Sequence, residues 1–487
     1  MILFYNIMIN DIPFDENFMV LNNFELNEIP KEIINYRNIY KLDVSHNKIT
    51  KISDEMKQLT HMTTLIMSFN QIEKISKIFK YNTNIYHLYL DNNKIKIISK
   101  YIKYLKNLHT AKFSNNEIVT LPNEIKYLTK LYTLELCNNQ IEKIPTSIKK
   151  LVRLRHLIIN FNKLKNIPNE IKYLTDLHFL LMNNNKITKI PNGISHLIHL
   201  KFVWLAGNKI EIIPAKIKYL NKIKSFNLAN NKIKIIPPEI KYLKNIEQFI
   251  IGSNKIKIIP PKIKYLKNIE QLGIDSNKIK VIPPEIKYLK KLEQFQLRCN
   301  YIKVLPNEIM YLSNLKKMDI KYNQINNLTE NIMYLTNITL LNISNNQIKI
   351  IPATIKYLVK LDTFNCSNNQ IEIIPTEIKF LGNLTLLNCS GNQIKRIPNE
   401  IKYLKKLETF NCSNNQIEII PNKIKFLTSL TSVNISNNKI TKLPKLVSTL
   451  TNLNISFNRI YKLKKNIYTN KLIFNDNNLC YLPNLNQ

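Results

Sequence analysis

An asparagine recurs at intervals of 23 residues over most of this 487-residue chain. A fixed period of this length is the signature of a repeat architecture, in which each unit buries its apolar face against its neighbours. The series predicts one elongated array rather than several separate globular domains. Its members are Asn47, Asn70, Asn93, Asn116, Asn139, Asn162, Asn185, Asn208, Asn231, Asn254, Asn277, Asn300, Asn323, Asn346, Asn369, Asn392, Asn415 and Asn438, with two shorter units at Asn458 and Asn477.

The apolar residues of each unit keep fixed distances from the asparagine, as in the segment 131–151, LYTLELCNNQIEKIPTSIKKL. The alternation around Leu134 predicts a short strand with one buried face. The Ile and Leu residues spaced by three or four after Pro145 predict a turn of helix on the opposite side. A proline stands at this offset in fourteen of the eighteen regular units. We expect it at the first helical position, where its missing N–H costs nothing.

This pattern resembles the leucine-rich repeat, whose signature is L-x-x-L-x-L-x-x-N-x-L. The unit length and the I-P-x-x-I-x-x-L tail are similar to the intracellular Ras-suppressor-like and plant Ras-group-related subclass. The resemblance covers about residues 39–479. It implies an α/β solenoid of horseshoe form, with parallel strands on the concave face and short helices or 3-10 turns on the convex face. It also implies that each recurrent asparagine satisfies backbone groups in the turn after its strand.

The ends of the array depart from the pattern, as expected for units that face water on one side. We assign residues 1–38 to an N-terminal cap with one degenerate repeat, in which Phe24 stands in place of the asparagine. Residues 39–458 form an array of about 19 repeats, and residues 459–487 form a shortened repeat and C-terminal cap. No linker or second domain is expected.

A patch of large apolar residues is predicted on the concave face, where the non-consensus strand positions point away from the core. Ile158, Leu181 and Trp204 occupy one column on three successive strands, and His156, Phe179 and Phe202 occupy the neighbouring column. Exposed apolar clusters mark binding sites, and Trp is favoured among interface hot spots. The alternative is that the rings fold back onto the solenoid. Charged residues border the patch in the next column, first Arg155, His178, Lys201 and Lys224, then Glu247, Glu270 and Glu293, then Lys316.

Two polar columns are predicted farther along the same face. One holds serines and the other holds asparagines, each in an N-x-S sequence. Hydrogen bonds from rung to rung are the structural interpretation, and a polar groove for an extended peptide is the functional alternative. The residues are Asn342, Asn365, Asn388, Asn411, Asn434 and Asn454 with Ser344, Ser367, Ser390, Ser413, Ser436 and Ser456.

The formal net charge of +37 raises nucleic acid and anionic membranes as partners. Only six of the 71 basic residues are Arg, the residue type that usually makes bidentate phosphate contacts. A lysine column beside a tyrosine column recurs on the predicted convex side, for example at Lys241 and Tyr242. Such columns are able to bind phosphates and stack bases. The structural alternative is that each ring covers the edge of the core while the lysine stem packs on it.

Catalysis, cofactors and metals are not expected. None of the six glycines forms a GxGxxG or GxxxxGK phosphate loop. Cys366, Cys389 and Cys412 fall in core-facing strand positions, which suits small buried hydrophobes rather than nucleophiles. The histidine pairs His87–His109 and His156–His178 lack a third ligand for zinc. No Ser–His–Asp arrangement can be assembled.

An intracellular, cytoplasmic location is expected. The opening MILFYNIMIN lacks the basic residues of a signal peptide, no apolar run is long enough to cross a bilayer, and the cysteines do not form paired disulfide caps. The row of N-x-S sequences would also invite glycans along one packed surface in a secretory lumen.

We therefore predict a non-catalytic scaffold that binds a protein partner through Trp204, Phe179, Phe202, Leu181, Ile158, Arg155 and Lys201. The resemblance implies signalling assemblies with small GTPases or phosphatases as partners, although no residue carries that inference over. The alternative is a basic surface that binds nucleic acid or an anionic membrane.

Overall fold

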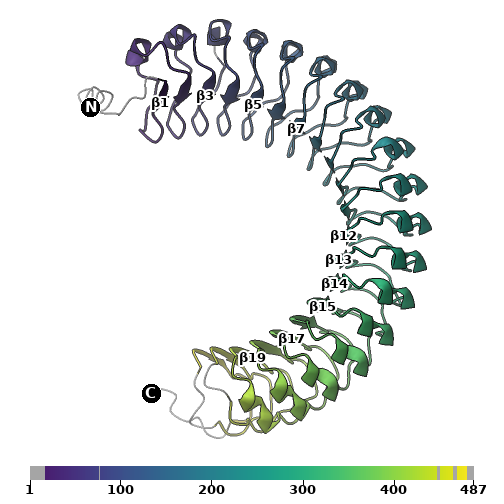
Figure 1. Ribbon diagram of the computed structural model, residues 1–487. Helices are drawn as coiled ribbons and strands as arrows, with labels where there is room; N and C mark the ends of the chain where they lie inside the picture. The colour runs from purple at the N-terminus through teal and green to yellow at the C-terminus, as the bar shows by residue number, and fades with distance from the viewer. Residues whose placement is uncertain (1–16, 76, 447–449, 464–468, 480–487) are drawn as a thin grey trace. The chain divides into compact units, whose positions relative to one another are not determined.

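The computed structural model describes residues 17–75, 77–446, 450–463 and 469–479 (Figure 1). It divides into two compact units, 1–233 and 234–487, each of which is considered by itself. The opening segment MILFYNIMIN and parts of both predicted caps lie outside the described residues. The boundaries of those caps, at residues 38 and 458, therefore stay predictions.

The described part of the first unit contains ten three-residue strands, which run parallel in sequence order. Each strand pairs with the residues 23 positions later wherever the repeat is regular, as Thr133 does with His156. The strands are β1 (Phe18–Val20), β2 (Lys41–Asp43), β3 (Thr64–Ile66), β4 (His87–Tyr89), β5 (Thr110–Lys112), β6 (Thr133–Glu135), β7 (His156–Ile158), β8 (Phe179–Leu181), β9 (Phe202–Trp204) and β10 (Ser225–Asn227).

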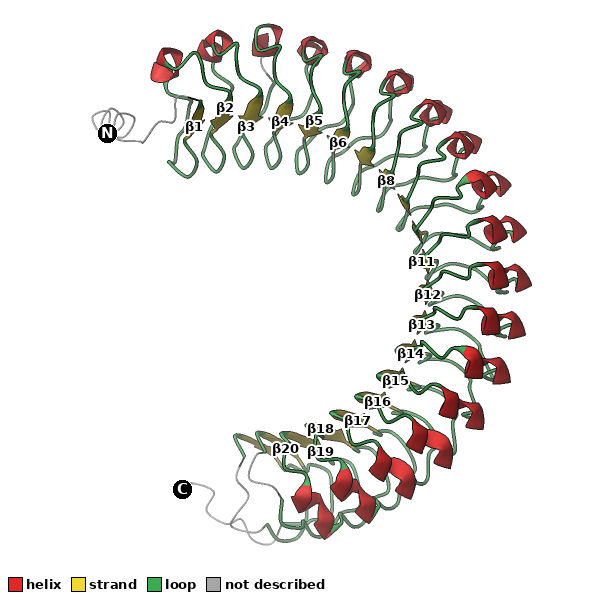
Figure 2. Ribbon diagram, viewed as in Figure 1, coloured by secondary structure: helices red, strands yellow, loops and turns green. Residues whose placement is uncertain are grey.

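Short 3-10 helices alternate with these strands and lie on the outer side of the unit, opposite the strand layer (Figure 2). They are η1 (Lys31–Asn35), η2 (Asp54–Gln58), η3 (Lys77–Lys80), η4 (Lys100–Tyr104), η5 (Asn123–Tyr127), η6 (Thr146–Lys150), η7 (Asn169–Tyr173), η8 (Asn192–His196) and η9 (Ala215–Tyr219).

The second unit repeats this arrangement, with eleven parallel strands among its described residues. They are β11 (Gln248–Ile250), β12 (Gln271–Gly273), β13 (Gln294–Gln296), β14 (Lys317–Asp319), β15 (Leu340–Asn342), β16 (Thr363–Asn365), β17 (Leu386–Asn388), β18 (Thr409–Asn411), β19 (Ser432–Asn434), β20 (Asn452–Asn454) and β21 (Lys471–Ile473).

The 3-10 helices of the second unit again lie on its outer side (Figure 2). They are η10 (Pro238–Tyr242), η11 (Pro261–Tyr265), η12 (Pro284–Tyr288), η13 (Asn307–Tyr311), η14 (Glu330–Tyr334), η15 (Ala353–Tyr357), η16 (Thr376–Phe380), η17 (Asn399–Tyr403) and η18 (Asn422–Phe426). The predicted α/β solenoid, with parallel strands on one face and 3-10 turns on the other, is confirmed.

The core lies between the strand layer and the 3-10 layer. The consensus residues of the unit at 131–151 are at most 3% exposed: Leu131, Leu134, Leu136, Ile141, Ile144, Ile148 and Leu151. Each unit is too thin to bury these side chains alone, so its stability comes from stacking on the units before and after it.

The recurrent asparagine joins neighbouring repeats, as the resemblance implied. The Nδ2 group of Asn139 donates to the backbone oxygens of Phe113 (2.9 Å), Leu136 (3.2 Å) and Cys137 (3.1 Å). Its Oδ1 accepts from the backbone N–H of Ile118 (2.9 Å). Turn groups that the strand ladder leaves unpaired are satisfied in this way.

The recurrent proline lies one residue earlier than predicted. Pro145 has an extended backbone (φ −69°, ψ 150°) and caps η6 rather than forming its first residue. Its carbonyl accepts the N–H of Ile148 (3.1 Å). A proline suits this site as well, because its fixed φ matches the extended approach to the helix. A second proline does occupy the first helical position in three units, at Pro238, Pro261 and Pro284.

Candidate interaction surface on the strand face

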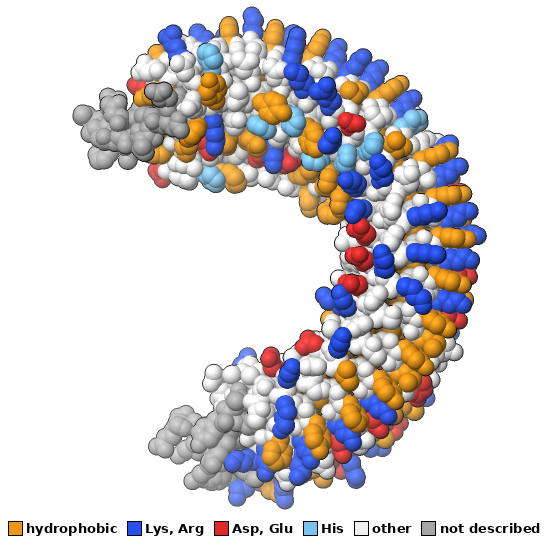
Figure 3. All heavy atoms as spheres, viewed as in Figure 1, with side chains coloured by type: hydrophobic (Ala, Val, Ile, Leu, Met, Phe, Trp, Pro, Cys, Tyr) orange, Lys and Arg blue, Asp and Glu red, His pale blue; other side chains and the backbone are white. Residues whose placement is uncertain are grey.

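The strand register of the first unit brings the predicted patch together. Ile158 pairs with Leu181, which in turn pairs with Trp204, and Phe179 pairs with Phe202 on the neighbouring column. All five side chains are half-buried, so each keeps a surface in contact with solvent. We call these five residues the concave patch. Figure 3 shows apolar and histidine side chains gathered on this inner face.

Ring contacts hold the concave patch in one arrangement. The rings of Phe179 and Phe202 stack at 4.6 Å between centroids, with planes 8° apart. His156 meets Phe179 edge-on at 4.7 Å. The indole N–H of Trp204 donates to the hydroxyl of Ser225 (3.0 Å). Because the rings of the patch already support one another, they would lose little side-chain freedom when a partner binds.

The two basic residues predicted for the border differ in setting. Arg155 is exposed, and its guanidinium lies 4.9 Å above the ring of Tyr132 and donates to the Tyr132 hydroxyl (3.0 Å). Lys201 is half-buried beside Phe202 in sequence. A guanidinium oriented by a ring beneath it remains available to pair with a carboxylate.

An aromatic stack that the sequence reasoning missed extends the patch toward the N-terminus. The ring of His109 lies between Tyr86 (4.7 Å) and Tyr132 (4.8 Å), with planes within 13° of each other, and Arg155 covers the far side of Tyr132. These four residues stand at the same offset, one position before the strand. Reading that column backward from Arg155 would have revealed them.

A groove of about 780 Å³ opens beside this stack. Its lining includes Tyr86 and His87 with Tyr40, Thr63, Asn107 and Lys130. Burial lowers the pKa of His87, and the nearby charge of His109 lowers it further; burial likewise lowers the pKa of His109. The Nδ1 atoms of both rings are buried without a hydrogen-bond partner in the described structure. Both rings therefore favour the neutral form.

The polar columns of the second unit bond differently from the prediction. The hydroxyl and the N–H of Ser344 both bond Oδ1 of Asn342, at 2.8 and 3.1 Å, within the same repeat. Ser344 is only 2% exposed. The bonds close a local turn instead of running from rung to rung, because the serine follows the asparagine by two residues. Five further repeats share the motif, at Asn365, Asn388, Asn411, Asn434 and Asn454.

The lysines of the outer side lie over the rings that follow them in sequence. The ammonium of Lys241 is 5.0 Å from the centroid of Tyr242, and the pair Lys264–Tyr265 has the same geometry at 5.4 Å. The rings are 40–43% exposed. This arrangement supports the packing interpretation. Nucleic-acid binding by these columns stays a prediction.

The predicted core cysteines are confirmed, since Cys366, Cys389 and Cys412 are fully buried and burial raises the pKa of each thiol.

The ring centroids of His87 and His109 are 6.3 Å apart. Within the described ranges, no three His, Cys, Asp or Glu side chains gather in a way that would hold a metal ion. In the same ranges, no helix has the length and apolarity needed to cross a membrane.

Family models for the leucine-rich repeat match residues 37–95, 267–325 and 290–348, and a model of two tandem copies matches 382–425 and 405–448. A leucine-rich repeat protein of Leptospira interrogans has a similar structure, with 31% identity and a TM-score of 0.69 over 80% of this chain and 94% of that one. This chain belongs to the leucine-rich repeat family. The fold of such proteins is a scaffold for protein interactions, and no observation links this member to catalysis.

Other solved leucine-rich repeat structures are similar to this one. An internalin of Listeria monocytogenes shares 26% identity, with a TM-score of 0.58 over 70% of this chain and 90% of that one. The Arabidopsis receptor kinase HAESA, in complex with the peptide hormone IDA, shares 22% identity, with a TM-score of 0.66 over 91% and 83%. No curated protein sequence matches this chain significantly.

Proposed function

We propose that this leucine-rich repeat protein is a non-catalytic, intracellular scaffold that binds a protein partner through the concave patch. The observation that carries the proposal is the single joined surface formed by Phe179, Phe202 and Trp204, three large rings that neither enter the core nor scatter over the molecule. Elsewhere the outward strand positions mostly hold small or polar residues, as at Thr363 and Asn365.

The chemistry of the patch favours a partner segment with apolar side chains and at least one carboxylate. Large preorganised rings supply the buried area at a protein interface, and Trp and Arg are enriched among its energetic centres. Arg155 would meet the carboxylate, because its guanidinium already lies fixed over Tyr132. Small GTPases and phosphatases remain candidate partners on family resemblance alone.

Two features support the intracellular part of the proposal. Cys366, Cys389 and Cys412 are free and buried in successive repeats, as is common where thiols stay reduced. The six asparagines of the N-x-S sequences accept hydrogen bonds from their own serines. Glycans at these sites, attached through the amide nitrogens, would place a row of bulky groups along the strand face.

The test is affinity capture with the full chain and two matched triple variants. F179S/F202S/W204S removes the rings of the patch, whereas Y127S/Y173S/Y219S removes three exposed rings from the outer side of the same unit. We expect the proteins captured by the wild type to be lost with the first variant and kept with the second. Circular dichroism checks that both remain folded. Unchanged recovery with a folded patch variant would remove the concave patch from consideration.

Trp204 also provides a direct signal, because it is the only tryptophan in the chain. Binding at the patch should shift its fluorescence emission to shorter wavelength as water leaves the indole. A captured partner that binds without changing this emission would contradict the proposal, whatever the capture experiment gives.

A further inference from the structure

A second surface, on the flank of the second unit, combines exposed aliphatic side chains with lysines. It lies on the extended stretch that leaves each asparagine turn and leads to the next 3-10 helix. Four consecutive repeats place an Ile or Val there that is 63–72% exposed: Ile235, Ile258, Val281 and Val304. Each follows directly after an exposed lysine, and these lysines are Lys234, Lys257, Lys280 and Lys303. We call these eight residues the flank ribbon.

The uninterrupted run of four lysine–aliphatic pairs is a local feature rather than a rule of the repeat. The equivalent positions of the repeats at 120–189 hold polar residues: Thr120, Lys143, Asn166 and Lys189. Exposed isoleucines do recur elsewhere in this column, at Ile97, Ile212, Ile350, Ile373 and Ile419. Three of them follow a glutamate, and the lysine–isoleucine pairs at 96–97 and 349–350 have no such pair in the next repeat on either side. A position needed for packing would keep its residue type in every unit, as the buried consensus positions do. The ribbon therefore calls for an explanation outside the solenoid.

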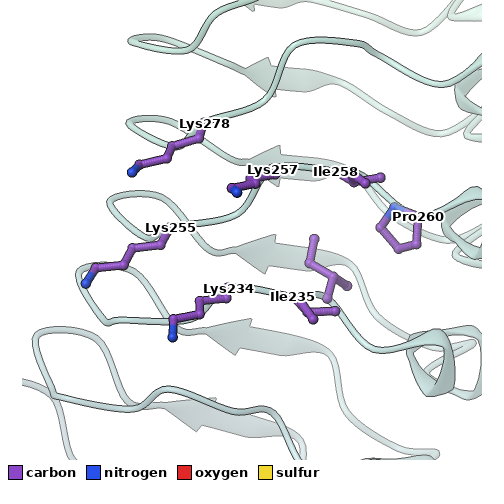
Figure 4. A pocket seen from close by; sticks show the side chains of 8 residues that line it. Lys234, Ile235, Lys255, Lys257, Ile258, Pro260 and Lys278 are labelled. Carbon is purple, nitrogen blue, oxygen red and sulfur yellow. The ribbon is translucent and has the colours of Figure 1, made fainter.

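The lysines of the ribbon leave their charge open to solvent. Ion pairs of this part of the described chain lie on the strand face instead, at Asp275–Arg298 and Glu293–Lys316. Lys255 and Lys278 add two more ammonium groups from the adjacent asparagine turns (Figure 4). Between these turns and Ile258 runs an open groove of about 580 Å³, which Pro260 also lines.

We propose that the flank ribbon binds the surface of an anionic lipid bilayer. Interfacial binding combines the burial of protruding apolar side chains with the attraction of lysines to acidic headgroups. The ribbon supplies both in one continuous row, because successive repeats stack side by side, about 5 Å apart along the strand ladder. The aliphatic tips would enter the headgroup region, and the lysines beside them would meet lipid phosphates and carboxylates.

Nucleic acid and protein fit this surface less well. Nucleic acid offers phosphates to lysines and bases to aromatic rings, so it would leave the aliphatic row in water. Protein interfaces are depleted in lysine and are centred on aromatic residues and arginine held in pockets. The ribbon has protruding aliphatic tips instead. The proposal is independent of the concave patch.

The experiment is co-sedimentation of the full chain with vesicles of phosphatidylcholine alone or with about 30% phosphatidylserine, at ~100 mM salt. Three variants are compared with the wild type. K234Q/K257Q/K280Q removes charge from the ribbon, and I235S/I258S/V281S removes its apolar tips. K241Q/K264Q/K287Q is the matched control, because it removes the same charge from the outer side of the same repeats.

We expect the wild type to bind only the acidic vesicles. K234Q/K257Q/K280Q should weaken this binding by at least about tenfold, since a lysine near an acidic bilayer contributes about a factor of five. I235S/I258S/V281S should weaken it by a similar factor, because it removes the apolar side chains that enter the headgroup region. The control should change it by less than about threefold. The replaced side chains of the ribbon are exposed and the control lysines are half-buried, so thermal unfolding checks that all three variants keep the fold.

Several outcomes would overturn the proposal. These are no binding of the wild type to acidic vesicles, an equal loss in the control, or full binding by the apolar variant. Binding of the wild type to single-stranded RNA but not to vesicles, abolished by the lysine variant, would assign the ribbon to nucleic acid instead.

Discussion

The side-chain oxygen of Asn139 accepts a hydrogen bond from the backbone N–H of Ile118, which belongs to the preceding repeat, over 2.9 Å. The amide of the same side chain donates to the carbonyl of Phe113, 26 residues earlier. Both bonds are buried. One residue thus fixes the register between two repeats and satisfies polar groups that a solenoid has no other means of pairing.

Replacing Asn139 with Ala should therefore destabilise the first unit. The change leaves the Ile118 N–H and the Phe113 carbonyl buried without their side-chain partner, and we expect a loss of about 2–4 kcal/mol in local unfolding free energy. Hydrogen exchange at Ile118 measures this directly, which avoids assuming that a long repeat array unfolds in one step. Asn123→Ala is the control, because Asn123 is exposed at the start of η5. Equal protection of Ile118 in both variants would contradict the assigned role.

A second asparagine, Asn82, stands where the neighbouring repeats place Leu59 and Leu105. It is fully buried and donates to the backbone oxygens of Met56 and Leu59, each at 2.9 Å. Its Oδ1 has no partner among the described residues. We predict that Asn82→Leu stabilises the first unit by about 1–2 kcal/mol, because it removes an unpaired buried acceptor and restores apolar packing.

The reverse change in the next repeat provides the matched control. Leu105→Asn should destabilise the unit by about 3 kcal/mol or more, since it creates a cavity and buries an amide. Denaturant midpoints of the two variants, compared with the wild type, test the pair. If Asn82→Leu proved as destabilising as Leu105→Asn, the two hydrogen bonds of Asn82 would be worth more than its unpaired oxygen costs.

Most of the fold could be predicted from the sequence because each repeat places the same residue types at the same core positions. The period places Asn139 and Pro145 at fixed offsets, and a buried face seen once is seen in every unit. The prediction failed on single residues. We predicted Pro145 at the first residue of the helix, but it is the residue before η6. Proline suits both positions, so the sequence does not distinguish them.

The candidate sites likewise contain features that the sequence predicts and features that only the structure shows. Pairing of Leu181 with Trp204 follows from the register, so the concave patch could be predicted. The shared column of Tyr86, His109 and Tyr132 could have been read from the sequence, but the stacking of their rings depends on rotamers, which a sequence pattern does not specify. The exposed column at Ile235 was missed for another reason. The repeat pattern assigns Ile236, directly before Pro237, to the core and leaves Ile235 outside it, but the extent of exposure at Ile235 is given only by the structure.

Acid should destabilise the first unit through His87 and His109. Burial lowers the pKa of both imidazoles below their usual value, so the unfolded chain binds more protons than the folded one between the folded and the unfolded pKa. The two histidines therefore cost the folded unit no stability above about pH 6.5, the pKa of histidine in the unfolded chain. The free energy of unfolding decreases as the pH falls from there through the folded pKa values. Melting temperatures recorded between about pH 7.5 and 5 test this.

The variant H87Q/H109Q should reduce this part of the pH dependence, although His156 keeps its share because burial lowers its pKa as well. His196→Gln is the control, because His196 is exposed at the end of η8. We expect the control to keep the slope of the wild type. Were the double variant to show that slope too, the acid sensitivity would have to come from other groups.

The residue before each recurrent asparagine adopts a left-handed backbone, and Phe161 does so at a cost. Its φ is 55°, whereas most equivalent positions hold Asn, Ser or Gly with similar angles. A bulky side chain in this region is strained by about 1–2 kcal/mol, and Asn tolerates it better. The Phe161 ring is 53% exposed, so little burial is lost on replacing it. We predict that Phe161→Asn stabilises the first unit by about 0.5–1 kcal/mol.

Two further variants separate strain from other effects. Phe161→Ala keeps a Cβ in the strained position and should give no comparable gain. Tyr173→Asn replaces an equally exposed ring on η7, where the backbone is helical, and should be neutral or slightly destabilising because the ammonium of Lys172 loses the ring 5.1 Å away. Denaturant midpoints rank the three variants. A gain shared by Tyr173→Asn would mean that removing any exposed ring stabilises the unit, and the left-handed turn would not be the cause.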